Sequence, residues 1–544
     1  MFKADMVVKP EDLKATILKL KNEEGYNLLL DVTATDYLAH HEKPENRFAL
    51  IYILRDKTFQ KSITIKTFLP NDKLEIDTIS DLYYSANWGE RETYDQYGIK
   101  FIGHPNLKRV LNHHQFVGHP LRKDYIITQG QICTETESLM DEMTPLMTSK
   151  GYSKEDLEEV MYLNIGPSHP ASHGTIRNFV ALEGETIRGC VTEIGYLHRG
   201  FEKSCENHNY NQIIPYTDRL NYCSAILNNI GFSKAVEDML QIDITDRAKF
   251  IRVIIGELSR ITDHLVCNAA NMVDMGGLTN FWYLFAPRDK AYDLFSKLTG
   301  ARLTNTYTRI GGLEFDLYDG FAEDLEDVLK DVEQAMEDAL SLVAHNKIFQ
   351  DRTQDVGIIT KELAISGGIT GPNLRATGID YDMRKSNPYY YYDTFDFDVV
   401  VGSHGDVYDR IMCRFEEMVQ SIRIIRQAMK QLPGGPINVD MPSIIMPDKK
   451  DVYGNIEGLM NQFKLVMDGV KVPQGEFYGA TEAANGELGF YIVSDGSGTP
   501  YKVKCRPPSY YALAAYPKIV ENTMIADAVI TMASMNFIAG EFDR

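Results

Sequence analysis

The chain has 544 residues, and its 77 acidic side chains outnumber the 56 basic ones, which gives a formal net charge of −21 at pH 7. This excess of negative charge argues against a nucleic-acid partner, because proteins that bind nucleic acids use Lys and Arg to displace counterions from phosphates. With 44% hydrophobic and 24% charged residues, the composition is that of a globular protein, and the length predicts several domains.

Residues 1–125 predict a small α+β domain. Apolar residues with helical spacing occur at 13–22, and alternating apolar residues, typical of half-buried strands, follow at 26–37, 47–54 and 62–69. The charged side chains of residues 126–160 are mostly acidic. We therefore expect a solvated linker there, closing in a short helix whose Ser153 and Asp156 form a capping box.

Residues 161–544 predict a mainly helical second domain. Apolar residues recur at spacings of three and four, which indicates long amphipathic helices, at 250–266, 321–343, 409–429 and 520–540. The glycine-rich segment 486–503 predicts a β-hairpin. The expected fold class is α+β, with a small α+β domain joined to a helix bundle that has short β segments at its rim.

The sequence predicts no membrane span and no secretory signal, because it has no run of about 18 uncharged apolar residues and no basic, apolar N-terminal segment. We therefore expect the chain to stay in the cytosol.

Its seven cysteines form no CxxC pair, which argues against a disulfide framework. The pairs His264 with Cys267 and Cys205 with His208 lack a second pair at zinc-site spacing, and no glycine-rich phosphate loop occurs. Neither a metal nor a nucleotide site is expected.

The loop NIGPSHPASHGTIR, residues 164–177, is the first candidate site. Its glycines and prolines break regular structure around two imidazoles, His169 and His173, and so can hold them toward a ligand. The β segment that follows ends in another basic cluster, His198 and Arg199. The alternative is a turn with two incidental histidines.

Two more candidates come later in the chain. In YTDRLNYCS, residues 216–224, Arg219 and Tyr222 are three positions apart, and we expect them to share a helix face. Arg supplies a permanent charge, and the Tyr phenol can donate a proton to an oxygen that is being reduced. Asp274 follows a strongly hydrophobic helix, where a buried carboxylate needs a partner such as histidine. The alternative for Arg219 and Tyr222 is a rim contact and a core contact. The alternative for Asp274 is a carboxylate that ends or caps a helix.

Several long motifs, in the right order, resemble subunits of respiratory complex I. Two of them resemble its 30 kDa subunit: WGERETYDQYGIKFIGHPNLKRVL (88–111) and FVGHPLRKDY (116–125). Five resemble its 49 kDa subunit: NIGPSHPASHGTIR, IGYLHRGFEK (194–203), YTDRLNY (216–222), GITGPNLRATGIDYDMRK (368–385) and the final IAGEFDR. The two parts are joined in one chain, as in the fused C/D subunit of bacterial NADH-quinone oxidoreductases.

The resemblance implies a fold and a site for residues 161–544. The 49 kDa subunit is similar in fold to the large subunit of nickel-iron hydrogenases, but the cysteine pairs that hold their metal are missing here. What the resemblance implies instead is a quinone headgroup in the vacated cavity, with His173 and Tyr222 at its carbonyl oxygens and Asp274 as the partner of His173. His169 would belong to the quinone loop.

The resemblance also implies neighbours. Arg219 would lie beside the terminal iron-sulfur cluster of an adjacent subunit, with Arg199 in the same neighbourhood, and this chain would bind no cofactor itself. The chain would be a peripheral-arm subunit of a proton-translocating NADH:quinone oxidoreductase, on the cytoplasmic side of the cell membrane. Expected partners are the cluster-bearing B subunit, the I subunit and the membrane-arm H subunit. Alternatives are a related hydrogenase-like membrane complex with another electron donor, and a structural scaffold.

One departure from the family bears on the quinone. The family commonly has a histidine in its Gly-Ala-Arg-x-His segment, where this chain reads GARLTNTY (300–307) with Thr304 in the histidine's place. Loss of a protonatable group near the cluster should weaken the pH dependence of its potential. Of menaquinone and ubiquinone, this favours a low-potential quinone such as menaquinone.

Overall fold

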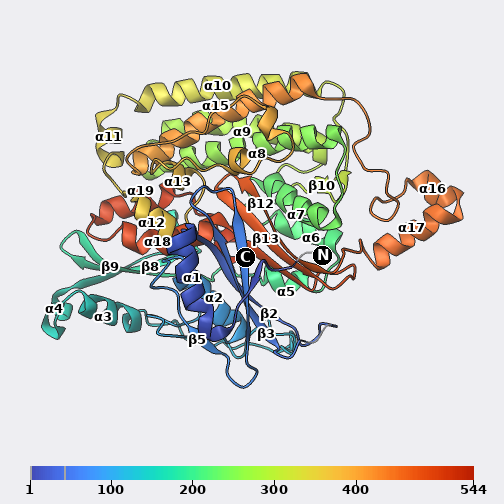
Figure 1. Cartoon of the computed structure of the whole chain (residues 1–544). Coiled ribbons are helices and arrows are strands. Elements are labelled where there is room, and N and C mark those ends of the chain that lie inside the picture. The colour runs from blue at the N-terminus through green and yellow to red at the C-terminus, as the bar shows by residue number, and fades with distance from the viewer. Residues whose placement is uncertain (1–2, 42–43) are drawn as a thin grey trace.

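The computed structural model describes residues 3–41 and 44–544, and it combines helices with several sheets, which confirms the α+β class (Figure 1). The N-terminal sheet has the strand order β1–β4–β3–β2, with β1 parallel to β4 and the other neighbours antiparallel. Its strands are β1 (Met6–Val7), β2 (Leu28–Asp36), β3 (Phe48–Arg55) and β4 (Ser62–Leu69). The three strands expected from the alternating apolar residues are therefore confirmed.

The remaining elements follow in chain order. Up to residue 193 they are η1 (Pro10–Asp12), α1 (Leu13–Lys19), η2 (Leu20–Glu24), β5 (Glu75–Asp77), α2 (Ala86–Tyr97), β6 (Lys100–Ile102), α3 (Met140–Ser149), α4 (Lys154–Glu159), β7 (Met161–Ile165), η3 (Pro170–Ser172), β8 (Arg177–Glu183) and β9 (Thr186–Glu193). Up to residue 366 they are α5 (Phe201–Cys205), α6 (Tyr210–Thr217), α7 (Ala225–Leu240), α8 (Asp246–Asp274), α9 (Leu278–Thr299), β10 (Thr308–Arg309), β11 (Gly312–Leu313), α10 (Phe321–Val343), α11 (Lys347–Thr353) and α12 (Lys361–Ser366). The last are α13 (Pro372–Arg375), α14 (Met383–Ser386), η4 (Tyr392–Thr394), α15 (Val407–Gln431), α16 (Lys449–Gly454), α17 (Ile456–Met467), β12 (Gly475–Ala483), β13 (Gly486–Ser494), β14 (Lys502–Arg506), α18 (Pro508–Ile519), α19 (Ile525–Ser534) and α20 (Ala539–Asp543).

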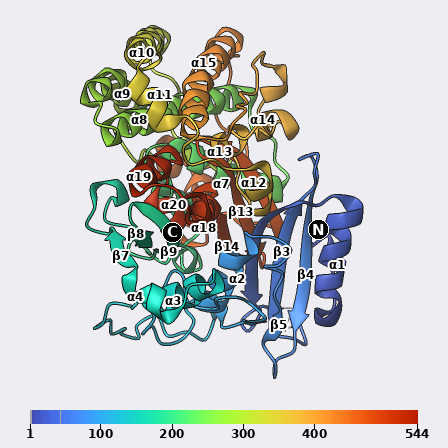
Figure 2. The same cartoon turned by 90° about the vertical axis from the view of Figure 1, so that its left-hand side faces the viewer.

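Strands β2 and β3 of the N-terminal sheet are buried on both faces. On one face Leu29 packs with Ile17 of α1, and on the other Leu28 packs with Tyr491 of β13. Figure 2 shows α1 and β13 on opposite sides of this sheet. Every residue of β2 and β3 is buried. The expectation of half-buried strands is therefore wrong for β2 and β3, because a second sheet covers the face that the alternation assigned to solvent. Strand β4 keeps exposed and partly exposed positions.

The acidic segment 126–160 contains a helix, α3, that sequence patterns did not predict. Its Met143 and Met147 are buried in a small core with residues of β8 and β9. The short helix at the end of the segment is α4, and its predicted capping box is confirmed. Ser153 Oγ accepts a hydrogen bond from the backbone N–H of Asp156 at 3.2 Å, and the Asp156 carboxylate accepts one from the N–H of Ser153 at 2.8 Å.

Four long helices, α8, α9, α10 and α15, form the upper layer of the molecule around one large hydrophobic core (Figure 1). This confirms the helices expected at 250–266, 321–343 and 409–429. Among the described residues, no helix combines the length and the apolar character needed to cross a membrane.

The second sheet, β12–β13–β14, lies in the middle of the molecule. Strands β13 and β14 form the predicted antiparallel hairpin. Every residue of β13 is buried, because α7 covers one part of the sheet and the N-terminal sheet covers another. The expectation of β segments at the rim of a helix bundle is wrong for this sheet.

The helix expected at 520–540 is interrupted. Helix α19 ends at Ser534, Asn536 has a left-handed φ of 53°, and a separate short helix, α20, begins at Ala539. The Asn536 amide donates hydrogen bonds to Asp263 Oδ1 at 2.7 Å and to Asn485 Oδ1 at 2.6 Å. These tertiary contacts explain why the apolar periodicity did not produce one continuous helix.

Candidate functional site

The loop with the two predicted histidines is held by its own hydrogen bonds. His169 caps the short helix η3 by accepting a hydrogen bond at Nδ1 from the N–H of Ala171, and His173 ends η3 with a left-handed φ of 52°. Ser172 Oγ bonds the carbonyl oxygens of Pro167 and His169, both at 2.9 Å. These bonds fix the backbone of the loop, on which His169 is partly exposed to solvent and His173 is exposed.

Asp274, the last residue of α8, lies close to this loop. Its side chain is partly open to solvent, yet burial by the surrounding protein raises the pKa of its carboxyl group. The positive charges of His173 and, to a smaller extent, His169 act in the opposite direction and lower that pKa. The structure thus brings His169, His173 and Asp274 together.

Tyr222 lies elsewhere, in a turn. The expectation that Arg219 and Tyr222 share a helix face is wrong, because residues 218–224 form turns between α6 and α7. Asn221 Oδ1 accepts the backbone N–H of Cys223 at 3.0 Å, a side-chain bond that competes with helical pairing. The pKa of Tyr222 is raised to about 12, chiefly by burial and to a smaller extent by the nearby charges of Cys223, Asp263 and Glu541.

Arg219 and Arg199 instead meet at a cavity of about 310 Å³. Its described lining residues, none of them acidic, are Arg199, Phe201, Ser204, Pro215, Tyr216 and Arg219. An Nη2 N–H of Arg199 donates to the carbonyl oxygen of Arg219 at 2.8 Å. Burial lowers the pKa of Arg199, and the charge of Arg219 lowers it further. Two guanidinium groups at a cavity without acidic side chains favour an anionic partner.

The backbone beside this cavity is anchored by the C-terminal segment. The Asp543 carboxylate accepts hydrogen bonds from the N–H groups of Gly195 and Leu197, each at 2.7 Å, and the N–H of Arg199 donates to the carbonyl oxygen of Arg544 at 3.0 Å. Burial raises the pKa of Asp543 to about 7. The final IAGEFDR motif therefore holds the LHRG loop in place.

One face of α8 connects the Tyr222 turn with the His173 loop. Asp263, Cys267 and Asp274 lie on this face, because their spacings of four and seven return to the same side of a helix. The pKa of Cys223 is raised by burial first and then by Asp263, with a smaller contribution from Cys267. The pKa of Cys267, in turn, is raised by burial and by both Asp263 and Asp274.

These electrostatic contacts form a continuous chain from the turn that carries Tyr222 to the carboxylate beside His173. The rise of an α-helix places the Cα atoms of Asp263 and Asp274 about 16 Å apart along this face. Sequence analysis missed Asp263. Its signal was its position: of the two acids inside the apolar helix at 250–266, Glu257 and Asp263, Asp263 shares a helical face with Asp274.

The residue pairs considered for zinc have other partners. His264 is fully buried, and its Nε2 lies 2.9 Å from Glu417 Oε2. His208 Nδ1 lies 2.7 Å from the carbonyl oxygen of Ser204. In the part of the chain that the structure describes, no group of three or more His, Cys, Asp or Glu side chains could hold a metal ion.

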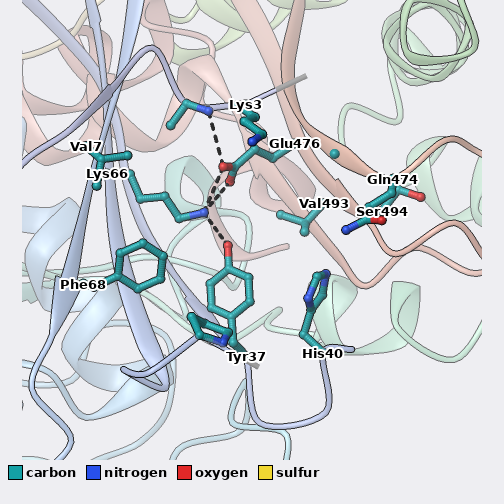
Figure 3. Close-up of a pocket in the computed structure, with 13 residues that line it drawn as sticks. Lys3, Val7, Tyr37, His40, Lys66, Phe68, Gln474, Glu476, Val493 and Ser494 are labelled. Atoms are coloured by element: carbon teal, nitrogen blue, oxygen red, sulfur yellow. Dashed lines mark hydrogen bonds and ion pairs between the residues drawn. The ribbon is translucent and has the colours of Figure 1, made fainter. Parts of the chain in front are cut away.

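A separate cavity of about 270 Å³ lies where the N-terminal sheet meets β12 and β13 (Figure 3). Lys66 Nζ bonds both Glu476 carboxylate oxygens, at 2.9 and 3.0 Å, and the hydroxyl of Tyr37 at 2.5 Å. None of the predicted site residues lines this cavity. The Lys66–Glu476 ion pair joins the two sheets across it.

Comparisons with known proteins agree with this arrangement of two joined parts. Residues 6–131 match the family described as respiratory-chain NADH dehydrogenase, 30 Kd subunit, and residues 274–544 match the family described as respiratory-chain NADH dehydrogenase, 49 Kd subunit.

Curated relatives extend the similarity over almost the whole chain. The C/D subunit of NADH-quinone oxidoreductase from Bdellovibrio bacteriovorus is 49% identical over 537 residues, which cover 99% of this chain and 94% of that protein. The D subunit of NADH-quinone oxidoreductase from Myxococcus xanthus is 53% identical over 384 residues, 71% of this chain and 92% of that protein. The chain therefore belongs to the family of fused C/D subunits of NADH-quinone oxidoreductase.

Proposed function

We propose that this chain is the peripheral-arm subunit of a proton-translocating NADH:quinone oxidoreductase that binds the quinone headgroup. The observation that carries the proposal is the continuous face of α8, which runs from Asp263 near the Tyr222 turn to Asp274 near the His173 loop. The hydrogenase-like fold implied by the sequence belongs to the same proposal, with a pocket that holds a quinone where a hydrogenase holds its metal.

The residues at the two ends of this face have complementary acid–base properties. Two-electron reduction leaves two basic oxygens on the quinone, and each takes a proton. The raised pKa of Tyr222, about 12, keeps its phenol protonated at neutral pH and therefore able to donate a hydrogen bond. The proposal assigns the second proton to the imidazole of His173, which lies near the carboxylate of Asp274.

The cavity between Arg199 and Arg219 supports a docking site for the terminal iron-sulfur cluster of the neighbouring B subunit. A cluster held by thiolates carries net negative charge, and fixed guanidinium groups nearby stabilise its reduced form. The proposal includes contacts with the I subunit and with the membrane-arm H subunit on the cytoplasmic side of the membrane. Electrons would then pass from the cluster to a quinone held by this chain.

Replacing Asp274 with Asn in the assembled complex tests the proposal. We expect quinone reduction with NADH to fall at least about tenfold, because the change removes the negative charge beside His173, the proposed proton donor. NADH oxidation by ferricyanide, which takes electrons before they reach the quinone, should stay within about twofold of the parent. Both rates are measured on the same purified enzyme.

A matched control is Asp289→Asn, a change of the same chemical kind at an exposed position on α9 that pairs with Arg302. It should leave both rates unchanged. A normal quinone rate in Asp274→Asn would contradict the assignment of Asp274. Loss of both rates would point to failed assembly, which the amount of purified complex reports independently.

A further inference from the structure

The side chain of Asp263 joins two segments that sequence analysis treated separately. It lies on α8 and is only 1% exposed. Its Oδ2 accepts hydrogen bonds from Asn221 Nδ2 at 2.7 Å and from Ser224 Oγ at 3.0 Å, and its Oδ1 accepts one from Asn536 Nδ2 at 2.7 Å. All three donors are neutral and buried.

Two of these donors flank Tyr222 in the sequence. Asn221 precedes it and Ser224 follows two positions later, so the same carboxylate oxygen holds the turn on both sides of the tyrosine. Asn228 Nδ2 also donates to the carbonyl oxygen of Asn221 at 3.0 Å. Because this turn belongs to no helix, these side-chain bonds hold the backbone from which the Tyr222 side chain projects.

The third donor connects the turn with the opposite end of the proposed quinone site. Asn536 lies between α19 and α20, and α19 contacts both α8 and η3, the short helix between His169 and His173. Asn536 also donates to Asn485 Oδ1 at 2.6 Å, which ties it to the β12–β13 turn. Asp263 therefore sits where the Tyr222 turn, α8 and the segment behind the histidine loop meet.

We propose that Asp263 is a positioning residue for quinone reduction, which holds the Tyr222 turn against α8 and Asn536 so that the phenol meets one quinone oxygen. This inference rests on the proposed function, since it acts through Tyr222. A carboxylate suits the position because it accepts from three donors at once and has no hydrogen of its own. An asparagine would direct an N–H group at one of those donors.

The test uses the assembled complex and a double-mutant cycle between Asp263→Asn and Tyr222→Phe. Asp263→Asn alone should lower kcat/KM for a short-chain ubiquinone or menaquinone analogue about tenfold, with the ferricyanide rate unchanged. In the Tyr222→Phe background, the same change should have less than about a twofold further effect, because the phenol that Asp263 positions is already absent. A residue that matters only for general stability would lower the ferricyanide rate and act equally in both backgrounds.

Three further variants keep the test informative if Asp263→Asn assembles poorly. Ser224→Ala removes a single donor and should lower quinone kcat/KM about threefold, again without further effect in Tyr222→Phe. The double variant Asp263→Asn/Asn536→Asp reverses the hydrogen bond between these two positions and should recover part of the lost quinone rate. Asp406→Asn is the control. It changes a buried carboxylate that accepts two backbone N–H groups at the start of α15, and it should leave the quinone rate within twofold of the parent.

The outcomes separate this inference from the proposed function. A normal quinone rate in Tyr222→Phe would refute the role of Tyr222 and with it the proposed function. A reduced rate in Tyr222→Phe, combined with independent, multiplicative effects of Asp263→Asn, would overturn only the positioning role of Asp263. A normal rate in Asp263→Asn or in Ser224→Ala would also overturn it.

Discussion

Glu90 and Glu92 lie two positions apart on α2, both buried, yet their surroundings favour opposite protonation states. Burial raises the pKa of Glu90 to about 8, since its hydrogen-bond donors, Thr78 Oγ1 and the N–H of Ile79, are neutral. Burial also acts to raise the pKa of Glu92, but the charges of Arg544 and Lys504 outweigh it and lower that pKa to about 2. Neighbouring carboxylates therefore respond differently to pH.

Glu90→Gln tests this difference through stability. Because the pKa of Glu90 is higher in the folded chain than in the unfolded one, its protonated form stabilises the fold at low pH. That contribution is lost as pH rises from about 4.5 to 8, at about 1.4 kcal/mol per pH unit. Glutamine stays neutral. The free energy of unfolding of the variant, relative to that of the parent, should therefore increase by about 2–3 kcal/mol between pH 6 and pH 9. Urea unfolding of the purified chain at both pH values measures it.

The control is Glu457→Gln at an exposed position on α17, which should show the same pH dependence as the parent. A difference between Glu90→Gln and the parent that does not change with pH would contradict the raised pKa of Glu90.

Individual residues also show how much of the candidate site could be predicted from the sequence. His169, His173 and Asp274 were singled out from glycine and proline spacing and from an acid in an apolar setting, and the structure places them together. Their roles in the reaction stay predictions. The helix expected for Arg219 and Tyr222 does not form, because the Asn221 side chain accepts the backbone N–H of Cys223, and side-chain bonds of this kind leave no periodic signal. Asp263 was not predicted because its hydrogen-bond partners come from two distant segments, the turn at 221–224 and Asn536.

At the level of elements, α7 packs unusually close to strand β12. A Cβ atom added at Gly479 would lie 2.8 Å from the Cβ of Ala235, and one added at Gly231 would lie 2.9 Å from Thr481 Oγ1. Small residues on both surfaces therefore permit the contact. Since α7 follows directly after the Tyr222 turn, this contact fixes the height of the turn above the sheet.

Gly479→Val should separate α7 from β12 and destabilise the chain by about 1–3 kcal/mol, because the added methyl groups have no space beside Ala235. The midpoint of urea unfolding measures the loss. Gly434→Val is the control, since a Cβ atom there meets nothing within 4 Å, and its effect should stay below about 0.5 kcal/mol. Equal midpoints for the two variants would contradict the close packing of α7.

Element positions could largely be predicted from periodicity, whereas their surroundings could not. The strands of the N-terminal sheet, the β13–β14 hairpin and three of the four long helices occur where the patterns place them. The burial of β2 and β3 on both faces depends on a sheet more than 400 positions away along the chain. The local alternation of apolar and polar residues cannot indicate such a distant partner. Helix α3 was missed because acidic residues outnumber basic ones across segment 126–160, which favours a solvated linker, while only two residues inside the helix, both methionines, are buried.

At the scale of the whole molecule, buried charges link the first and last parts of the chain. Glu92 on α2 accepts hydrogen bonds from Lys504 on β14 and from Arg544, the latter at 2.8 Å. Glu202 and Asp31 approach the same Lys504, at 3.4 and 4.0 Å. The side chains of all these residues are buried, so the cluster fixes how the N-terminal sheet sits against the rest of the protein.

Glu92→Gln should destabilise the chain by about 3–5 kcal/mol at pH 7, because Lys504 and Arg544 then remain buried with less compensating negative charge. Urea unfolding gives the size of the effect, and limited proteolysis should cut first near the junction of the two sheets. Glu337→Gln, at an exposed position on α10, is the control and should be neutral. Unchanged stability of Glu92→Gln would show that this cluster does not hold the two parts together.

The bond between Glu92 and Arg544 spans 452 positions, which has a consequence for synthesis on the ribosome. At about 5–20 residues per second, the arginine emerges about 20–90 s after the glutamate. Throughout that interval the carboxylate stays hydrated, and the apolar side of β2 and β3 that β13 later covers is open to other nascent chains. Translational pauses before residue 486 would prolong this window, so the protein's dependence on chaperones should rise with slower elongation.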